Sequence, residues 1–417
     1  MNVVFLEASS GSVVGGSLSG MLELLRGLDR RRISPFVVLY EHKPSTADLV
    51  AQGVPVRVFD KRRLPKQHGL EHSASYAKAK QIGAVGALMR GARALATFLV
   101  ETVPAALRLA RLVREARPDL IYVCNGFRGN ADAIVAARIL RVPCVVHAKG
   151  FDKFTFVERM LSRRVALCVS MTKAIEHHCR RGGMRPGAFT VVYDGLDLGA
   201  FRPARGAGEV REELAVAADA EVVGVVGNIQ QWKGQRVLVD AIDLLRERRP
   251  RLVAWLVGGV HRSGLAYAEA LRAHLRERGL ERRVWLTGSR NDVPDLMAAM
   301  DIVVHTSVRG EPFGRVIIEA MAVGRPVIAT RAGGVPEFVH EGRDALLTTP
   351  GDAAELATAI DRLLGDAGER ARLAAAALES VQRFRLDRHV ETMCALFEGV
   401  AAGRRGRDLV GAVEGAA

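Results

Sequence analysis

Short runs of β-branched and aliphatic residues alternate with segments of helical length through most of this 417-residue chain. The first series of runs is Val3 to Leu6, Phe36 to Tyr40, Val54 to Val58, Leu120 to Cys124, Val142 to His147 and Leu167 to Ser170. The second series is Val222 to Val226, Leu252 to Val257, Arg283 to Thr287, Ile302 to His305 and Pro326 to Thr330. Such alternation predicts parallel sheets with helices on both faces. The expected fold class is α/β, with two Rossmann-like, doubly wound domains in tandem, which also suits the chain length.

The two series meet between Val191 and Pro203, where an apolar run gives way to Gly, Asp and Pro residues. Such residues mark turns and linkers. We expect an N-terminal domain over residues 1–197 and a C-terminal domain over residues 198–384. We expect the helix at about 385–402 to pack back on the N-terminal domain, and the tail at 403–417 to be flexible.

The net charge of +14 is unevenly distributed. Residues 1–197 hold 30 Lys and Arg against 16 Asp and Glu, whereas residues 198–417 hold 30 of each. This asymmetry favours an anionic partner, such as a phospholipid surface, a lipid-diphosphate acceptor or nucleic acid. A basic segment begins at Lys61 and leads into an apolar and basic helical pattern, so contact with an anionic membrane through 61–117 is expected. The alternatives are a solubilising face and a solvated helix that covers the sheet.

The cysteine pattern and the first residues bear on location. The five cysteines include no C-x-x-C pair and mostly fall in apolar stretches, as buried thiols of a reducing cytosol do. The N-terminus has no basic region of a signal peptide, and charged residues interrupt the apolar stretch 82–113. We expect a cytoplasmic protein, with peripheral attachment to the inner face of the plasma membrane as the finer expectation.

Two glycine-rich loops follow the first strands of the two domains. In doubly wound sheets, ligands bind at the carboxyl ends of the strands. The loop Ser9–Gly20 contains Gly15 and Gly16, which would let the backbone approach a phosphate or acceptor; packing is the alternative. The loop after Val226 adds Lys233, which can neutralise a diphosphate leaving group. The alternative is a surface lysine at a helix start, which the helix dipole disfavours.

A third loop follows the run Ile302 to His305 and carries two glutamates, Glu311 and Glu319. If a helix starts near Phe313, Glu311 lies on the loop and Glu319 about two turns along the helix, so both can face one extended ligand. The amides of Phe313, Gly314 and Arg315 would face a phosphate at the positive end of the helix. One carboxylate would bind a sugar hydroxyl and the other a ribose diol. Glutamates at this spacing also occur by chance.

Together with Gly324–Glu337 and Gly342–Asp352, this segment closely resembles the signature of retaining glycosyltransferase family 4, which has the GT-B fold (glycosyltransferase group 1). The resemblance covers the whole chain. It implies that Glu311 contacts the donor sugar, that Glu319 contacts the ribose, and that Lys233 binds the diphosphate. It implies that Gly15 and Gly16 approach the donor from the other domain.

His147 matches the strand-end histidine that the family places beside the donor sugar. Without the resemblance, a hydrogen-bonded structural histidine is the more frequent case.

Two positions depart from the family pattern. Asn228 stands where the family usually has an arginine, and Asp194–Gly195 stands where it commonly has Asn–Gly. Arg290 or Arg315 would have to supply the missing charge. The chain contains no Asp-x-Asp and no His/Cys cluster at metal-ligand spacing, so we expect no metal site and metal-independent catalysis.

The resemblance implies transfer of a sugar from a nucleoside diphosphate to an acceptor hydroxyl with retained anomeric configuration. The nucleotide sugar is a co-substrate, no cofactor is expected, and UDP is favoured over GDP because the family uses it often. We expect the acceptor to be a glycan or a lipid-linked or phosphate-bearing molecule. The expected setting is the synthesis of bacterial cell-surface glycan, lipopolysaccharide or glycolipid. No nucleic acid partner is expected. The alternatives are a sugar-nucleotide epimerase, a glycan phosphorylase, a catalytically weak nucleotide-sugar-binding or membrane-associated scaffold, and a basic adaptor for nucleic acid or membranes.

Overall fold

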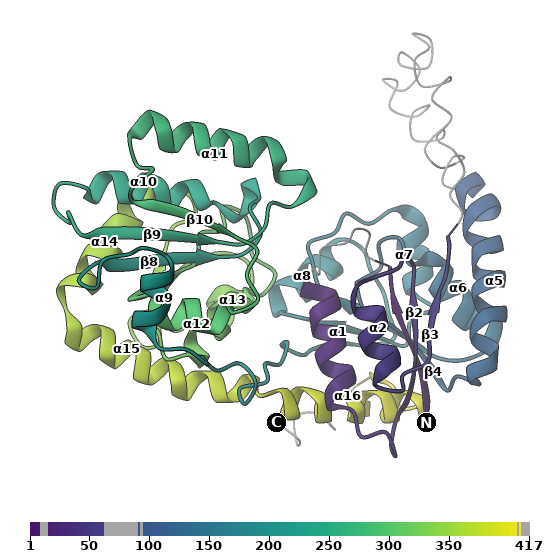
Figure 1. Ribbon diagram of the computed structural model, residues 1–417. Coiled ribbons are helices and arrows are strands. Elements are labelled where there is room, and N and C mark those ends of the chain that lie inside the picture. Colours follow the sequence, from purple (N-terminus) through teal and green to yellow (C-terminus); the bar gives the residue numbers. More distant parts are fainter. Residues whose placement is uncertain (9–15, 62–90, 92–94, 407, 410–417) are drawn as a thin grey trace, which may run out of the picture. The chain divides into compact units, whose positions relative to one another are not determined.

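The computed structural model describes residues 1–8, 16–61, 91, 95–406, 408 and 409, which belong to two compact units. Unit 1 comprises Met1–Val192 and Val390–Ala417, and unit 2 comprises Tyr193–His389. Each unit is built around one parallel sheet with helices packed against it, which confirms the predicted fold class (Figure 1). Most of the basic segment 61–93 and most of the first glycine-rich loop lie outside the described residues.

Unit 1 has a seven-stranded sheet in the order β3-β2-β1-β4-β5-β6-β7, and every neighbouring pair is parallel. Its strands are β1 (Asn2–Glu7), β2 (Ser34–Leu39), β3 (Val56–Val58), β4 (Leu120–Val123), β5 (Cys144–Ala148), β6 (Leu167–Ser170) and β7 (Phe189–Val191). Its α-helices are α1 (Gly16–Gly27), α2 (Ser45–Ala51), α5 (Val103–Val113), α6 (Ala131–Leu140), α7 (Phe156–Ser162), α8 (Lys173–Arg181) and α16 (Leu386–Ala401). Short helices η1 (Phe98–Thr102) and η2 (Arg114–Ala116) flank α5.

Most of the last helix, α16, from Val390 onward, belongs to unit 1 although it follows unit 2 in sequence. The ring of Phe397 lies 5.0 Å from that of Tyr122 on β4 and 6.0 Å from that of Phe5 on β1, both edge-on. Edge-on aromatic pairs add to the free energy gained by burying these rings. Arg32 also pairs with Glu391 and Glu398 of this helix. These contacts attach the end of the described chain to the first sheet.

Unit 2 has a six-stranded parallel sheet in the order β10-β9-β8-β11-β12-β13. Its strands are β8 (Glu221–Val226), β9 (Leu252–Val257), β10 (Val284–Gly288), β11 (Ile302–Val304), β12 (Val327–Thr330) and β13 (Leu346–Thr348). Its α-helices are α9 (Ala207–Glu213), α10 (Gln235–Leu245), α11 (Leu265–Arg278), α12 (Val293–Ala299), α13 (Arg315–Ala322), α14 (Ala353–Gly365) and α15 (Ala367–Ser380). Short helices are η3 (Gln231–Lys233), η4 (Arg262–Gly264), η5 (Val335–Glu337) and η6 (Val381–Phe384).

The core of unit 2 follows from the alternation of side chains along its strands. Val223 and Val225 of β8 lie in one apolar cluster with buried residues of α10, α11 and α14. Val222, which precedes them and points to the other face of the pleat, is buried as well. Because helices cover both faces of the sheet, the strands read as continuous apolar runs, as they do in parallel sheets generally.

The strands that correspond to the runs expected from the sequence lie within two residues of them. Strands β7 and β13 were not among those runs: β7 ends at Val191, where the linker was expected to begin, and the three residues of β13 fall within the segment Gly342–Asp352. Helix α13 begins at Arg315 rather than near Phe313. The reason is that Gly314 has φ +93°, a left-handed conformation that a right-handed helix cannot contain. Glu319 therefore lies about one turn, not two, into the helix.

The strand order reverses once in each sheet, between β1 and β4 and between β8 and β11. Chain connections leave in opposite directions at such a point, so the loops at the carboxyl ends of the two strands open a crevice for ligands. In unit 2 these are the loops that carry Lys233, after β8, and Glu311, after β11. The topology therefore brings together two of the residues that the sequence singled out.

Candidate functional site

Glu311 is the centre of a buried polar cluster in unit 2. Its Oε2 atom accepts hydrogen bonds from Lys233 Nζ at 2.9 Å, from Ser307 Oγ at 2.7 Å and from His305 Nε2 at 3.0 Å. Lys233 ends the short helix η3 after β8, whereas His305 and Ser307 follow β11 directly. The sequence predicted Lys233 and Glu311, and the structure brings them into direct contact.

The surroundings of Glu311 decide its charge. Burial alone raises the pKa of a carboxyl group, because it disfavours the charged form. Here the hydrogen bond from His305 and the positive charge of Lys233 outweigh burial, and they hold the pKa of Glu311 well below its usual range. Glu311 is therefore an ionised acceptor at neutral pH.

Glycine and threonine residues lock the loop after β8 onto the loop after β11. Gly234 has φ +67°, and a Cβ atom there would lie 2.1 Å from the carbonyl oxygen of Thr306. Thr306 Oγ1 donates to the carbonyl oxygen of Lys233 at 2.8 Å. The amide of Val308 donates to the carbonyl oxygen of Trp232 at 2.9 Å. Only glycine fits at position 234, and its close packing fixes the backbone that carries Lys233.

A second glycine holds Glu311 from the side of β12. Gly333 has φ +65°, and a Cβ atom there would lie 2.1 Å from the carbonyl oxygen of Glu311. The amide of Gly334 donates to that same carbonyl oxygen at 2.8 Å. The loops that follow β8, β11 and β12 therefore all contribute to the placement of Glu311.

Helix α13 starts beside the cluster and carries the second glutamate. Glu319 accepts a 2.9 Å hydrogen bond from Arg315 Nε one turn earlier, and both side chains are mostly buried. The side chain of Phe313 is buried against the rings of Phe338, at 4.8 Å between centroids, and Tyr193, at 6.0 Å. Phe313 can therefore offer a ligand its backbone rather than its ring.

Asn228 lies in the loop after β8, where the family pattern has an arginine. Its carbonyl oxygen accepts a 2.9 Å hydrogen bond from Gln235 Nε2 at the start of α10. Gly258 packs close by, since a Cβ atom there would lie 2.1 Å from the carbonyl oxygen of Gly227. The backbone of Asn228 is thus fixed on both sides, and its side chain is half-buried.

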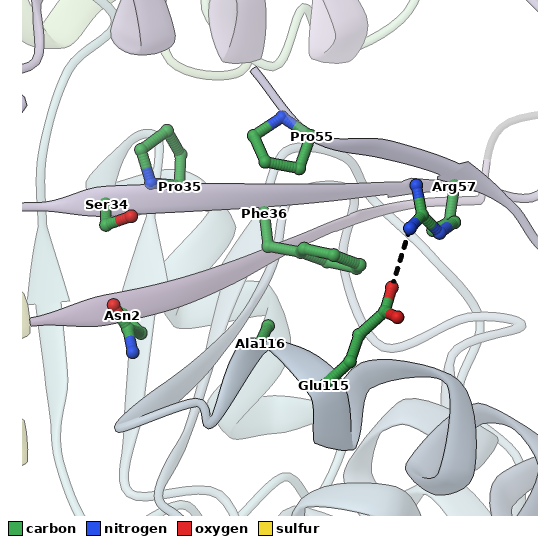
Figure 2. A pocket seen from close by; sticks show the side chains of 8 residues that line it. All are labelled: Asn2, Ser34, Pro35, Phe36, Pro55, Arg57, Glu115 and Ala116. Carbon is green, nitrogen blue, oxygen red and sulfur yellow. Dashed lines mark ion pairs between the residues drawn. The ribbon is translucent and has the colours of Figure 1, made fainter. Parts of the chain in front are cut away.

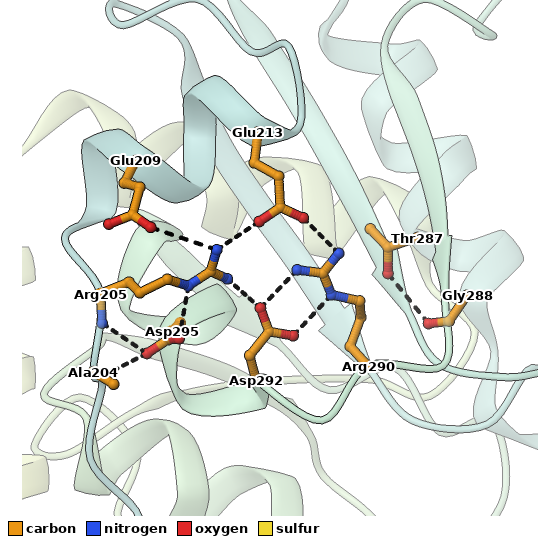
Figure 3. Close-up of polar contacts among 9 residues, drawn as sticks. All are labelled: Ala204, Arg205, Glu209, Glu213, Thr287, Gly288, Arg290, Asp292 and Asp295. Atoms are coloured by element: carbon orange, nitrogen blue, oxygen red, sulfur yellow. Dashed lines mark hydrogen bonds and ion pairs between the residues drawn. The ribbon is translucent and has the colours of Figure 1, made fainter.

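Arg290 belongs to a different cluster of charges, drawn in Figure 3. Its guanidinium donates to Asp292 at 2.8 and 2.6 Å and to Glu213 at 2.7 Å. Arg205 bonds to the same two carboxylates and to Asp295. Hydrogen bonds from Arg290 and Arg205 lower the pKa of Glu213 to about 2. The structure does not join Arg290 to the Glu311 cluster, and its role at a diphosphate stays a prediction.

The remaining predicted residues lie in unit 1. His147 is buried on β5, and its Nδ1 atom lies 2.6 Å from the hydroxyl oxygen of Tyr122. Gly16 is the first residue of α1, and Gly15 lies outside the described residues. Within the described ranges, no group of three or more His, Cys, Asp or Glu side chains could hold a metal ion.

Three members of the Glu311 cluster were not expected from the sequence: His305, Ser307 and Thr330. Thr330 Oγ1 lies 3.1 Å from His305 Nδ1, at the end of the neighbouring strand β12. The available signal was the run His305-Thr-Ser307, three polar residues directly after a buried strand.

Two family models match the chain. One is described as "Glycosyl transferases group 1" and matches residues 220–366, which include the whole Glu311 cluster. The other is described as "Glycosyl transferase 4-like domain" and matches residues 15–195. The chain belongs to the group 1 glycosyltransferases.

Curated relatives of this glycosyltransferase include D-inositol 3-phosphate glycosyltransferases. That of Streptomyces bingchenggensis is 30% identical over 254 residues, which are 60% of this chain and 56% of the relative. That of Nocardioides sp. is 36% identical over 211 residues, which are 48% of this chain and 46% of the relative. The chain thus spans about half the length of the curated relatives it matches.

Solved structures resemble the chain over nearly its whole length. Anabaena Alr3699/HepE in complex with UDP-glucose has a TM-score of 0.78 at 28% identity, and the match covers 96% of this chain and 100% of that chain. Its complex with UDP has a TM-score of 0.77. A glycosyltransferase from Rickettsia africae has a TM-score of 0.79 at 16% identity, which shows the same fold, over 96% of this chain and 98% of that one.

The packing of Gly333 against Glu311 predicts unequal effects of two alanine substitutions. Gly333 and Gly342 both have left-handed φ angles, but nothing lies within 4 Å of a Cβ atom at Gly342. Gly342→Ala should cost about 1–2 kcal/mol from backbone strain alone. Gly333→Ala should lower the free energy of unfolding of unit 2 by clearly more, because its Cβ meets the Glu311 backbone. Urea unfolding measures both; equal losses would show that position 333 does not constrain Glu311.

Proposed function

We propose that this glycosyltransferase binds a nucleoside-diphosphate sugar at the Glu311 cluster and transfers the sugar to an acceptor hydroxyl with retained anomeric configuration. The observation that carries the proposal is the ion pair between Lys233 and Glu311, 2.9 Å long, at the reversal of strand order in unit 2. Such a reversal is where doubly wound sheets bind nucleotides. The complexes of Anabaena HepE with UDP and UDP-glucose support the proposal, since that protein is 28% identical to this chain.

Each polar group of the site suits one part of such a donor. Lys233 would neutralise the diphosphate, and the first amides of α13 would add the positive end of a helix. Glu311, held ionised, would accept a hydrogen bond from a sugar hydroxyl, and Glu319 would accept from the ribose. Asn228 would donate to the diphosphate without a charge. Stabilising the departing diphosphate in this way would supply much of the catalysis.

We propose UDP as the nucleotide and transfer that needs no metal ion. The choice of UDP is supported by the complexes of HepE with UDP and UDP-glucose, since HepE has the higher identity of the two proteins compared above. Metal independence rests on the sequence, which has no Asp-x-Asp, and on Lys233 and the helix start as sources of positive charge.

We propose that the acceptor carries phosphate or a lipid and binds unit 1. Residues 1–197 hold the whole excess of positive charge, and the curated relatives are named for a phosphorylated inositol. An anionic acceptor would be attracted to such a field. Synthesis of a bacterial surface glycan or glycolipid in the cytoplasm is the setting we propose.

Replacing Glu311 tests the donor site. Glu311→Gln should lower kcat/KM for release of UDP from UDP-glucose by about 10²-fold or more, because it removes a charged acceptor from the reacting sugar. Asp361→Asn is the matched control, since Asp361 lies on α14 of the same unit and pairs with Arg248 and Arg249. The assay is run with and without EDTA. Equal rates for Glu311→Gln and the wild type would show that Glu311 does not act on the donor, and a wild type that releases no UDP would point to a scaffold. Loss of wild-type activity in EDTA would refute metal independence.

We further propose that α5 and the turns before it contact an anionic membrane. Leu95, Leu99, Val100 and Leu107 are each more than half exposed, at spacings that place them along one side of a helix. Figure 1 shows α5 on the outside of unit 1, beside α6. No helix of the described part of the chain has the length and hydropathy to cross a membrane. An apolar stripe of this kind suits the surface of a bilayer.

Basic residues adjoin this stripe. Arg57, Arg108 and Arg111 line a shallow hollow with Leu112 and Glu115. Arg57 pairs with Glu115 at 3.0 Å beside a second hollow at the amino ends of β1 and β2 (Figure 2). Three arginines against one glutamate leave positive charge for lipid phosphates.

Vesicle binding tests this surface. The protein should sediment with phosphatidylglycerol vesicles but not with phosphatidylcholine vesicles, and added salt should release it. Arg111→Glu should weaken binding about 10-fold, since each basic residue near an anionic surface contributes about 1 kcal/mol. Arg181→Glu, an exposed arginine at the end of α8, is the control. If both variants bind like the wild type, α5 is not the contact surface.

A further inference from the structure

Glu311 accepts hydrogen bonds from His305 and Ser307 in addition to the one from Lys233. We propose that His305 and Ser307 are positioning residues: they hold the Glu311 carboxylate in place and ionised while Lys233 turns from Glu311 to the diphosphate of the donor. This inference rests on the proposed function, because it assigns a task to residues around the proposed donor site. It goes beyond it by predicting that two residues out of reach of the donor control its binding.

The three side chains form a closed triangle. Ser307 Oγ lies 2.7 Å from Glu311 Oε2 and 3.0 Å from His305 Nε2, and His305 Nε2 lies 3.0 Å from Glu311 Oε2. Each of these distances is within the normal range of a hydrogen bond. A carboxylate bonded in this way can leave its position only by breaking two bonds in a buried space, where lost bonds are costly.

The backbone of β12 sets which nitrogen of His305 carries the proton. The amide of Thr330 lies 3.5 Å from His305 Nδ1, and Thr330 Oγ1 lies 3.1 Å from the same atom. An amide N–H can only donate, so it favours Nδ1 as the acceptor. The imidazole proton then sits on Nε2 and points at Glu311. His305 thus donates its Nε2–H to the carboxylate.

The three side chains that donate to Glu311 differ in how exposed they are to solvent. The side chain of Lys233 is 23% exposed, whereas that of His305 is 3% exposed and Ser307 is fully buried. A ligand can therefore reach Lys233 but not the other two donors. When a diphosphate draws Lys233 away, His305 and Ser307 are the remaining donors to Glu311 Oε2 among the contacts described above.

The hydrogen bond from Ser307 to Glu311 should affect the affinity for UDP. Without Ser307 Oγ, Glu311 depends more on Lys233, so a diphosphate must compete with a buried carboxylate for the same ammonium group. UDP should then bind more weakly although the substitution does not touch the ligand. With Gln at position 311 there is no charge to compete, and the loss should disappear. A general disturbance of the fold would weaken binding equally in both backgrounds.

The test is a double-mutant cycle on UDP binding, measured by calorimetry with the full chain. Ser307→Ala should weaken UDP binding about 10-fold in the wild-type background and less than 2-fold in the Glu311→Gln background, an expectation based on the size of a hydrogen bond to a charged group. Ser307→Thr, which keeps the hydroxyl, should restore wild-type affinity. His305→Gln, which keeps a donor nitrogen, should lie between the wild type and Ser307→Ala.

A histidine outside the Glu311 cluster provides the control for the histidine variant. His274→Gln changes another buried histidine of unit 2 that contacts a carboxylate, Asp240, and should leave UDP affinity unchanged. Thermal unfolding identifies any variant that does not fold. If the histidine variants do not fold, Ser307→Ala, which removes only one atom, still tests the inference in both backgrounds. An equal loss in both backgrounds overturns the inference, as does no loss in either. If the wild type binds neither UDP nor UDP-glucose, the proposed function itself fails.

Discussion

The ion pair between Lys233 and Glu311 is the interaction on which the proposed site depends. It joins the loops after β8 and β11, the two strands between which the order of the second sheet reverses. A carboxylate as buried as Glu311 is costly unless its charge is compensated, and removing one partner of such a pair typically destabilises a protein strongly. Compensation here comes from the ammonium group of Lys233 and from hydrogen bonds of His305 and Ser307. Lys233 and His305 also keep the pKa of Glu311 low against the effect of burial. The site is therefore charged and ordered before any ligand arrives.

Close backbone packing makes this arrangement rigid. Gly234 and Gly333 adopt left-handed conformations and lie against the carbonyl oxygens of Thr306 and Glu311, respectively, where any side chain would collide. Three strand ends thus converge on one carboxylate. A rigid, preorganised set of charges stabilises a developing charge without reorganisation during the reaction. This is why the glycines around Glu311 bear on function and not only on turns.

Much of the fold and the centre of the site could be predicted from the sequence. Apolar runs alternating with segments of helical length predicted the two parallel sheets. The loops after Val226 and His305 predicted Lys233 and Glu311 as site residues, whereas the ion pair between them came from the structure. Thr330 escaped prediction because its contact with His305 depends on β11 lying beside β12 in one register. The contacts of His305 and Ser307 with Glu311 depend on how the loop after β11 folds back, which residue type alone did not fix. The pairing of Arg290 with Glu213 was equally hidden, since the two lie far apart in the chain. The start of α13 followed from the conformation of Gly314, which residue type alone left open.

A crystal structure of the protein with UDP-glucose would show whether the donor binds at the Glu311 cluster. We expect the diphosphate at Lys233 and a glucosyl hydroxyl within hydrogen-bond distance of the Glu311 carboxylate, which keeps its bonds to His305 and Ser307. UDP-glucose bound elsewhere, or bound with its glucosyl group out of contact with Glu311, would contradict this expectation.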